Sequence, residues 1–448
     1  MAVMVFLVLV AGCNKNDFLN EKPQQSQVVP TTLQDFQAIL DNDNVMNGAL
    51  NMGVVPTLGE IGTTDYYLAD SNFRGHLSIQ EQNEYIWAVN PYPGTDVTDW
   101  DLPYIAVLYA NEVITGITGM KVAASDQPEW NNLMGSALFY RSFFFYNLAQ
   151  IFAPPYREGE TQLGIPLRLT ADVNEKLVRA SLADTYTRII TDLKTSTSLL
   201  PITALYGTRP CRPAAYALLA RIYLVLGDYT DALSYADSCL SLNNTLIDYN
   251  TLDTTSSLPI ARFNAENLFN CVLIRSAPFL YGRVDGNLYA SYTPNKDLRP
   301  GAWFKGNPAR LKCSYDGSFN PYGGIATDEV YLIRAECSAR LGNAKGAIGD
   351  LNTLLVNRFA AGTFQALSDT SADAALTSVL AERRRELIFR GLRWPDLRRL
   401  GSDAERADTL YRFVLGQPYT LLPDDLRYTY PIPDNVLGFN PGMVQNPR

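Results

Sequence analysis

The sequence predicts a mostly α-helical protein in which helices come in pairs and long loop-rich segments separate the pairs. Two observations support this fold class. Apolar residues recur at spacings of three and four over several long segments, as on the buried face of an amphipathic helix. Two other segments, approximately 42–103 and 243–326, lack this periodicity and are rich in Asn, Asp, Gly, Pro and Tyr. We expect the helices to form a scaffold and such long loops to carry function.

Composition narrows the possible functions. The 448 residues include 37 Lys and Arg against 46 Asp and Glu, so the formal net charge is −9. An acidic chain is poorly suited to binding nucleic acid, and we expect no nucleic-acid partner. The single histidine, His76, excludes most histidine-based hydrolase and transition-metal sites. Aromatic residues are abundant, with 26 Tyr, 19 Phe and 5 Trp.

The first twelve residues form an apolar run that ends in Ala11-Gly12 and is followed by Cys13 and a polar stretch. The run is too short to span a bilayer and is typical of an export signal, the alternative being an apolar N-terminus of a protein that is not exported. Small residues before a cysteine resemble a bacterial lipoprotein signal. That resemblance implies removal of residues 1–12, lipidation of Cys13 and a lipidated tether over residues 13–30.

The remaining cysteines fit neither a zinc site nor a disulfide framework. They are odd in number and include no C-x-x-C pair. Cys239 and Cys337 fall on apolar helical positions, where cysteine behaves as a small hydrophobic residue. We expect the same structural role for the whole set, which is Cys211, Cys239, Cys271, Cys313 and Cys337.

The first helix pair is predicted over residues 131–152 and 181–200. Its first helix is aromatic or apolar on nearly every side between Phe139 and Tyr146. A helix of this kind is buried in a core or in a membrane. Because Arg141, Asn147 and Gln150 interrupt the apolar surface, we expect a buried core helix.

The next two pairs share one design. Residues 212–226 and 229–242 are predicted helices joined at Gly227-Asp228, and residues 328–358 repeat the arrangement. In each hairpin an alanine precedes the glycine by seven residues and another follows it by five. Small residues at fixed offsets let two helices approach closely, and the pattern resembles a tetratricopeptide repeat. The two sets are Ala220, Gly227, Ala232 and Ala335, Gly342, Ala347.

The last helical run is predicted over residues 374–400 and is rich in arginine. Pro395 is expected to kink or divide it. Because the chain is acidic, we interpret the arginines as an ion-paired helix face and not as a phosphate-binding patch. Two carboxylate–arginine pairs have the spacing of stabilising ion pairs within a helix, Glu386 with Arg390 and Asp396 with Arg399.

Several segments, in order along the chain, resemble motifs of the SusD/RagB family of outer-membrane nutrient-uptake lipoproteins. The most specific segment, 382–399, resembles the family's E-R-R-R-E-L-x-F-E-G-H-R-W-F-D-L-R-R and departs from it at Arg390, Leu392 and Pro395. The other matching segments are D-F-L-N-E-K-P at 17–23, Trp100 with Tyr104 and Asn111, residues 137–150, G-I-P-L at 164–167, residues 213–224, residues 328–336, Y-P-I-P at 430–433, and N-P at 440–441 and 446–447.

This resemblance implies a single SusD-like domain over residues 31–448 with about four tetratricopeptide-like helix pairs. The helix-pair scaffold would occupy approximately 131–241 and 327–400, with ligand-binding loops at 42–103 and 243–326. It implies a lipid anchor as the only membrane attachment, on the exterior of the outer membrane. It also implies an oligosaccharide or glycan ligand, a SusC-like TonB-dependent transporter as partner, and neither catalysis nor a cofactor.

Three alternatives stay open at this point. The ligand could be a peptide or glycoprotein in place of a glycan. The protein could be a carboxylate-based glycoside hydrolase, because that chemistry needs two acidic residues and no histidine. It could also be a tetratricopeptide adaptor that binds only protein, an interaction that docking to a transporter would itself include.

Glycan binding needs flat aromatic side chains for stacking and polar groups for hydrogen bonds. The loop segments supply both, and a tryptophan in a loop needs a packing or binding partner. An acidic cluster of Asp96, Asp99 and Asp101 offers at most a weak Ca²⁺ site. The candidate ligand-binding residues are Asp65, Tyr67, Arg74, Trp87, Asn90, Tyr92, Trp303 and Tyr315.

Overall fold

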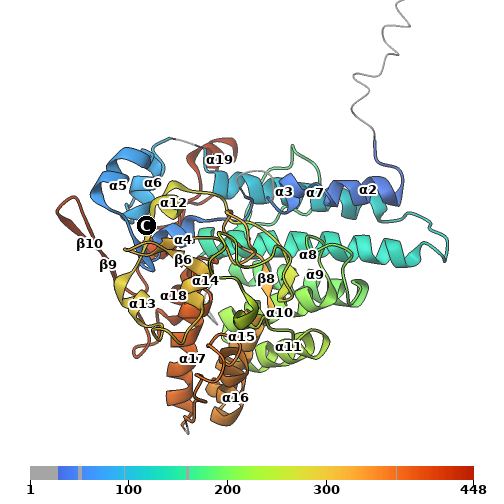
Figure 1. The fold of residues 1–448 in the computed structure, drawn as a ribbon. Coiled ribbons are helices and arrows are strands. Elements are labelled where there is room, and N and C mark those ends of the chain that lie inside the picture. Colours follow the sequence, from blue (N-terminus) through green and yellow to red (C-terminus); the bar gives the residue numbers. More distant parts are fainter. Residues whose placement is uncertain (1–28, 49–52, 95, 158–160, 370) are drawn as a thin grey trace, which may run out of the picture.

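The computed structural model describes residues 29–48, 53–94, 96–157, 161–369 and 371–448. The predicted signal, Cys13 and nearly all of the predicted tether lie outside these ranges. Helices dominate the described chain and strands are few and short, which confirms the mostly α-helical prediction (Figure 1). None of the described helices combines the length and the apolar character needed to cross a membrane.

The scaffold is a succession of packed helices. Neighbours along the chain contact each other in the hairpins α8–α9, α10–α11 and α15–α16, and α11 also packs against α15. Figure 1 shows these hairpins stacked toward the lower end of the molecule, where α16 and α17 lie. The bounds are α7 (Thr98–Ile117), α8 (Gln127–Phe152), α9 (Leu182–Leu199), α10 (Arg212–Leu226), α11 (Tyr229–Leu242), α15 (Thr327–Arg340), α16 (Ala344–Leu355), α17 (Ala372–Glu386) and α18 (Arg393–Leu400).

The hairpins α10–α11 and α15–α16 are connected by the same type of turn. Gly227 follows α10 with φ of 78°, and Gly342 follows α15 with φ of 86°. Only glycine adopts this left-handed conformation without steric cost. The next residue then caps the second helix, because the side chains of Asp228 and Asn343 accept hydrogen bonds from its first turn. The alanines at matched offsets are fully buried, as predicted: Ala220, Ala232, Ala335 and Ala347.

The aromatic helix α8 is a buried core helix, as predicted. Its aromatic residues between Phe139 and Tyr146 are at most 2% exposed. Of the three polar residues that interrupt it, Arg141 and Gln150 are buried, whereas Asn147 is half-buried and donates to the carbonyl of Phe143 at 2.7 Å. Arg141 forms a 2.7 Å ion pair with Asp192, and the Gln150 side chain donates to the Tyr186 hydroxyl at 2.8 Å.

The arginine-rich run is two helices, and the break is not caused by the proline. Helix α17 ends at Glu386 and α18 begins at Arg393, while Phe389 and Gly391 between them have φ of 60° and 73°. Pro395 lies in the first turn of α18, where a missing backbone N–H costs no helical hydrogen bond.

The two loop-rich segments contain more regular structure than their composition predicts. Residue 98 already begins the long helix α7, so the first segment ends earlier than expected. The short helices are α2 (Leu33–Leu40), α3 (Asp43–Met46), α4 (Leu58–Gly62), α5 (Asp70–His76), α6 (Ile79–Tyr85), η1 (Tyr249–Thr251), α12 (Ala277–Tyr281), α13 (Gly286–Ala290), α14 (Arg299–Trp303), η2 (Leu426–Tyr428) and α19 (Asp434–Phe439).

Each sheet of the described chain pairs two short antiparallel strands. Two of these pairings, β1 with β5 and β4 with β8, join segments that are distant in sequence. The pairs are β1 (Tyr66–Tyr67) with β5 (Arg283–Val284), β2 (Leu163–Pro166) with β3 (Arg179–Ser181), β4 (Asn267–Phe269) with β8 (Ile325–Ala326), β6 (Phe304–Lys305) with β7 (Arg310–Leu311), and β9 (Leu410–Val414) with β10 (Gln417–Leu421).

The loop-rich segments contribute a hydrophobic cluster of their own. It lies apart from the main cluster around α8 and α10 and from a third cluster around α15, α16 and α17. Tyr66, Phe73 and Tyr85 of the first segment pack there with Phe279 and Trp303 of the second. Many aromatic residues of these segments are therefore buried, because they fill this second core.

A chain of buried ion pairs joins the second loop-rich segment to the scaffold. Arg299, at the start of α14, pairs with Asp297 at 2.6 Å, with Glu382, and with Glu386 of α17 at 2.7 Å. Arg358, just after α16, pairs with Glu386 at 2.7 Å and with Glu266 at 2.8 Å. We call this set the central ion-pair chain, and its members Glu266, Asp297, Arg299, Arg358, Glu382 and Glu386 are all buried.

The structure confirms one predicted helical ion pair and corrects the other. Asp396 pairs with Arg399 at 2.9 Å. Glu386 does not pair with Arg390, because α17 ends before the needed turn. Arg390 instead forms a 2.5 Å ion pair with Asp328 of α15. Six of the seven arginines of this block pair with carboxylates, as predicted for an ion-paired helix face. The seventh, Arg398, donates to the backbone carbonyls of Ala149 and Ala153.

Replacing Arg358 by methionine should leave Glu266 and Glu386 buried with one partner fewer. We expect the free energy of unfolding, measured by urea denaturation, to fall by about 3–5 kcal/mol. The matched control is Arg157→Met, since Arg157 pairs with Asp424 at the surface, and there we expect a loss of about 1 kcal/mol or less. Equal losses in the two variants would contradict a structural role for the central ion-pair chain.

Two glutamates are buried without an ion pair in the described chain. Glu60 of α4 is 1% exposed and Glu84 of α6 is 2% exposed. Burial, together with the nearby carboxylates of Asp65 and Asp99 respectively, raises the pKa of each to about 8. The folded protein therefore holds protons that the unfolded chain releases near pH 4.5.

This difference predicts a pH dependence. The two carboxylic acids favour the folded state most at low pH, and this contribution is lost as pH rises through about 8. The double variant Glu60→Gln, Glu84→Gln should gain Tm over the wild type as pH increases from about 5 to about 9, by about 3 °C or more. Differential scanning calorimetry measures this gain. The exposed Glu112→Gln is the control, and a constant difference across the pH range would refute the prediction.

Candidate functional site

The two loop-rich segments meet and form one surface, as their assignment to a common ligand site requires. In the sheet of β1 and β5, Tyr67 lies opposite Arg283, and the backbone N–H of Asp285 donates to the carbonyl of Asp65 at 2.8 Å. Helix α12 of the second segment also contacts α5 and α6 of the first. Figure 1 shows α5, α6 and α12 gathered at one side of the molecule, away from the stacked hairpins.

Five of the eight candidate ligand-binding residues are buried, so the structure does not place them at a ligand surface. Trp87 is 1% exposed, and its indole N–H donates to the carbonyl of Gly62 at 2.9 Å. The guanidinium of Arg412 lies 4.7 Å from its ring. Trp87 thus has packing partners within the protein and needs no ligand to cover its ring. The five buried candidates are Asp65, Trp87, Tyr92, Trp303 and Tyr315.

The other buried candidates also have structural roles. Trp303 packs edge-on against Tyr249 in the second core. Tyr315 donates its hydroxyl to Glu266 of the central ion-pair chain. Asp65 forms a 2.8 Å ion pair with Arg384 of α17. Tyr92 belongs to the main hydrophobic cluster, where burial raises the pKa of its hydroxyl.

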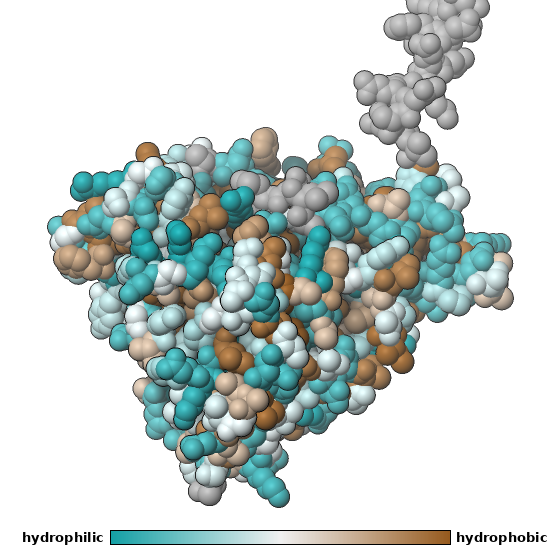
Figure 2. Space-filling model, viewed as in Figure 1, coloured by the Kyte–Doolittle hydropathy of each residue, from teal (hydrophilic) through white to brown (hydrophobic). Residues whose placement is uncertain are grey.

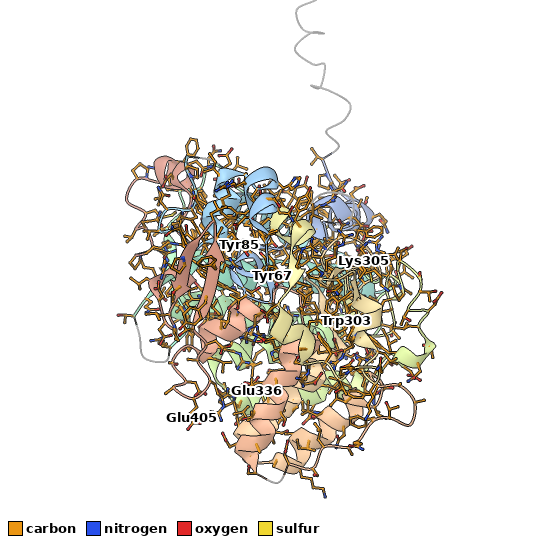
Figure 3. The ribbon with its side chains drawn as sticks, turned by 60° about the vertical axis from the view of Figure 1, so that its left-hand side comes forward. Tyr67, Tyr85, Trp303, Lys305, Glu336 and Glu405 are labelled. Carbon is orange, nitrogen blue, oxygen red and sulfur yellow. The ribbon has the colours of Figure 1, made fainter. Side chains whose placement is uncertain are left out.

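Three candidates are exposed, and two of them share the surface where the segments meet. Tyr67 is 42% exposed on β1, and Arg74 is exposed on α5. Asn90 is exposed as well, but it lies on the loop between α6 and α7. Figure 3 shows Tyr67 just below the blue helices of the first segment and Lys305 of β6 at a similar height.

The structure adds residues that were not among the eight candidates. The rings of His76 and Tyr281 stack, with centroids 4.1 Å apart and planes inclined by 12°. Both side chains are exposed, Tyr281 to 37%. Arg283 follows Tyr281 by two residues. We call Tyr67, Arg74, His76, Tyr281 and Arg283 together the aromatic surface.

A close backbone approach holds this surface together. A Cβ at Gly282 would lie 2.6 Å from the ring of Tyr66 and 2.8 Å from the carbonyl oxygen of Pro278. Only glycine therefore fits between Tyr281 and Arg283. Glycine beside two such residues is a weak sequence signal, and the stacking of His76 on a residue 205 positions away has no local signal at all.

The structure does not place Asp96, Asp99 and Asp101 together around one point. Asp99 is buried in the first turn of α7, where it accepts hydrogen bonds from the backbone N–H groups of Thr57 and Leu58. Burial raises its pKa to about 6. Asp96 accepts from the amide of Asn435 at 2.7 Å, and Asp101 is half-buried on the helix. Among the described residues no group of three or more His, Cys, Asp or Glu side chains is placed to hold a metal ion.

The cysteines of the described chain confirm the expected structural role. Cys211, Cys239, Cys271, Cys313 and Cys337 are buried and free. Burial raises the pKa of each thiol, to about 11 for Cys211 and Cys313. A thiol that stays protonated is a poor nucleophile and a poor metal ligand.

Similar solved structures share this fold over nearly their full length. A putative sugar-binding protein from Bacteroides vulgatus is 23% identical with a TM-score of 0.75, covering 94% of this chain and 99% of that chain. A SusD superfamily protein from Bacteroides thetaiotaomicron is 22% identical with a TM-score of 0.75, covering 93% and 100%. A SusD-like carbohydrate-binding protein from Bacteroides vulgatus is 18% identical with a TM-score of 0.68, covering 92% and 98%.

Family profiles match on both sides of the second loop-rich segment. A profile described as starch-binding and associating with the outer membrane matches residues 17–224, and the SusD family profile matches residues 327–448. No curated protein matches the chain. The second match includes the arginine-rich block and its buried ion pairs. The chain belongs to the SusD/RagB family.

Proposed function

We propose that this protein is a non-catalytic glycan-binding lipoprotein of the outer membrane, which captures an oligosaccharide outside the cell and delivers it to a SusC-type TonB-dependent transporter. The observation that carries this proposal is the aromatic surface, which two insertions of the helical scaffold build together. The family supports it, because one family profile is described as starch-binding and similar solved structures are described as sugar- or carbohydrate-binding.

The aromatic surface has the chemistry that an oligosaccharide needs. A sugar ring presents a C–H face, which packs on flat aromatic rings, and a rim of hydroxyls, which take hydrogen bonds. The stacked rings of His76 and Tyr281 and the ring of Tyr67 offer the flat faces. The guanidinium groups of Arg74 and Arg283 donate hydrogen bonds beside them. An open surface of this kind admits a long chain, because the ligand need not enter a closed pocket.

The alternatives have less support. A peptide would use the same aromatic and guanidinium groups, so competition decides between the two ligand classes. A glycoside hydrolase needs two accessible carboxyl groups flanking the scissile bond. Asp99 is buried and bound to backbone N–H groups, which removes it from such a pair. The adaptor alternative is contained in the proposal as docking to the transporter.

The aromatic surface is tested by affinity electrophoresis in gels that contain starch, xylan, mannan, polygalacturonate or chondroitin sulfate. We expect at least one glycan to retard the wild type. Tyr281→Ala and Tyr67→Ala should each raise Kd by about fivefold, since stacking on a sugar contributes on the order of 1 kcal/mol per ring. Tyr206→Ala is the control, because Tyr206 is 58% exposed in the loop between α9 and α10.

Retardation that survives both substitutions would overturn the assignment of the aromatic surface. Release of reducing sugar from the retarding glycan would favour the hydrolase alternative. Displacement of the glycan by a tryptic peptide digest, at equal mass concentration, would favour the peptide-binding alternative.

The proposed anchor is the lipid on Cys13, which is followed by a tether to the first described helix, α2. Metabolic labelling with palmitate should mark the wild type and leave Cys13→Ser unlabelled. The unlabelled variant should leave the membrane fraction, because a lipid anchor is the proposed membrane attachment. Label that persists in Cys13→Ser would contradict the anchor. Chemical cross-linking in the same membranes tests the proposed interaction with the transporter. Purification of this protein after cross-linking should also recover the SusC-type transporter.

A further inference from the structure

A row of outward side chains crosses four short strands beside the aromatic surface. Tyr67 of β1 lies opposite Arg283 of β5, and Lys305 of β6 lies opposite Arg310 of β7. Strands β5 and β7 are neighbours, because β5 contacts β7 and the backbone N–H of Val284 donates to the carbonyl of Ala309 at 2.8 Å. The two small sheets therefore lie next to each other.

The alternation along these strands directs the charged side chains to the solvent. The neighbouring residues on β1, β5 and β6 point inward: Tyr66 is 2% exposed, Val284 is 2% exposed and Phe304 is 5% exposed. Lys305 and Arg310 are exposed, and Arg283 is half-buried. Successive side chains of a strand point to opposite faces. We call Arg283, Lys305 and Arg310 the basic row.

The basic row carries no compensating charge in the part of the chain that the structure describes. None of its three members forms an ion pair there, and neither does Arg74. Like charges directly opposite each other in a sheet are destabilising, and Lys305 and Arg310 are such a pair. A protein with a net charge of −9 thus gathers unpaired cations at one edge of its proposed ligand surface.

Acidic side chains of the same segments are engaged elsewhere. Asp65 pairs with Arg384. Asp285 caps α13 by accepting from the backbone N–H of Leu288 at 2.9 Å. Glu81 accepts from the backbone N–H of Ala277 at 2.7 Å. None of these three carboxylates therefore forms a direct ion pair with the basic row, whose guanidinium and ammonium groups can pair with a ligand.

We infer that the glycan is acidic and carries sulfate or carboxylate groups. This inference rests on the proposed function, whose aromatic surface would stack the sugar rings while the basic row pairs with the anionic substituents. Guanidinium groups suit this role, because their planar fork binds carboxylate and sulfate oxygens in pairs. Repeated negative charges along a polysaccharide match cations that are spaced along a row of strands.

The test compares matched acidic and neutral glycans by isothermal titration calorimetry. Dextran sulfate is paired with dextran, and polygalacturonate with its methyl ester, so the first pair tests sulfate and the second tests carboxylate. We expect at least one acidic member to bind about tenfold or more tighter than its neutral partner. Raising NaCl from about 50 to about 300 mM should remove most of this preference, since exposed charges are screened.

Two triple variants with the same net charge distinguish a local effect of the basic row from an effect of the overall charge of the protein. Arg283→Gln, Lys305→Gln, Arg310→Gln should abolish the preference and its salt dependence. Its Tm should equal or exceed that of the wild type, because the like-charge pair is gone. Lys121→Gln, Lys176→Gln, Lys345→Gln removes exposed lysines elsewhere and should leave the preference intact.

Three outcomes overturn the inference. The wild type could bind neutral and acidic members equally, the two triple variants could behave alike, or anionic vesicles could bind while neither acidic glycan does. If a neutral glycan binds and its affinity depends on Tyr281, the proposed function stands and only the acidic ligand is refuted. If no glycan binds at any salt concentration, the proposed function fails with it.

Discussion

The buried pairing of Arg299 and Arg358 with the carboxylates of Glu266, Glu382 and Glu386 is the interaction on which the rest of the structure depends. A desolvated charge is tolerated only when its partners stand within hydrogen-bonding distance. The second loop-rich segment supplies Glu266 and Arg299, whereas the scaffold supplies the other three. The insertion can therefore occupy only the position in which these groups meet.

That fixed position explains how an exposed surface can be built on very short strands. Two-residue strands and helices of one or two turns are not stable alone. Here their inner faces fill the second hydrophobic core, which Tyr66, Phe279, Trp303 and Phe304 share. The burial of those aromatic residues holds the backbone, and the exposed side chains between them keep a defined spacing. On the face drawn in Figure 2, hydrophilic side chains prevail and hydrophobic ones lie scattered among them.

Local signals in the sequence predicted the scaffold well. Helices 212–226 and 229–242 have the predicted bounds, because a proline at the first turn, a left-handed glycine and a capping aspartate act within a few residues. The candidate site was predicted less well. Trp87 and Tyr67 look alike as loop aromatics, and only the pairing of residues 66–67 with 283–284 decides which one faces solvent. The break after Glu386 is marked locally only by Gly391, because Phe389, which also has a positive φ, carries no such signal.

Inward and outward residues alternate on β1, β5 and β6, so substitutions at the two kinds of position have different consequences. Substitutions of Tyr66, Val284 or Phe304 alter the core and are limited by their effect on the stability of the fold. Changes at Tyr67, Arg283 or Lys305 leave the core untouched and are filtered only by what the surface binds. In a protein arranged in this way a few surface substitutions change what the surface binds, while its scaffold and any contacts made by that scaffold stay the same.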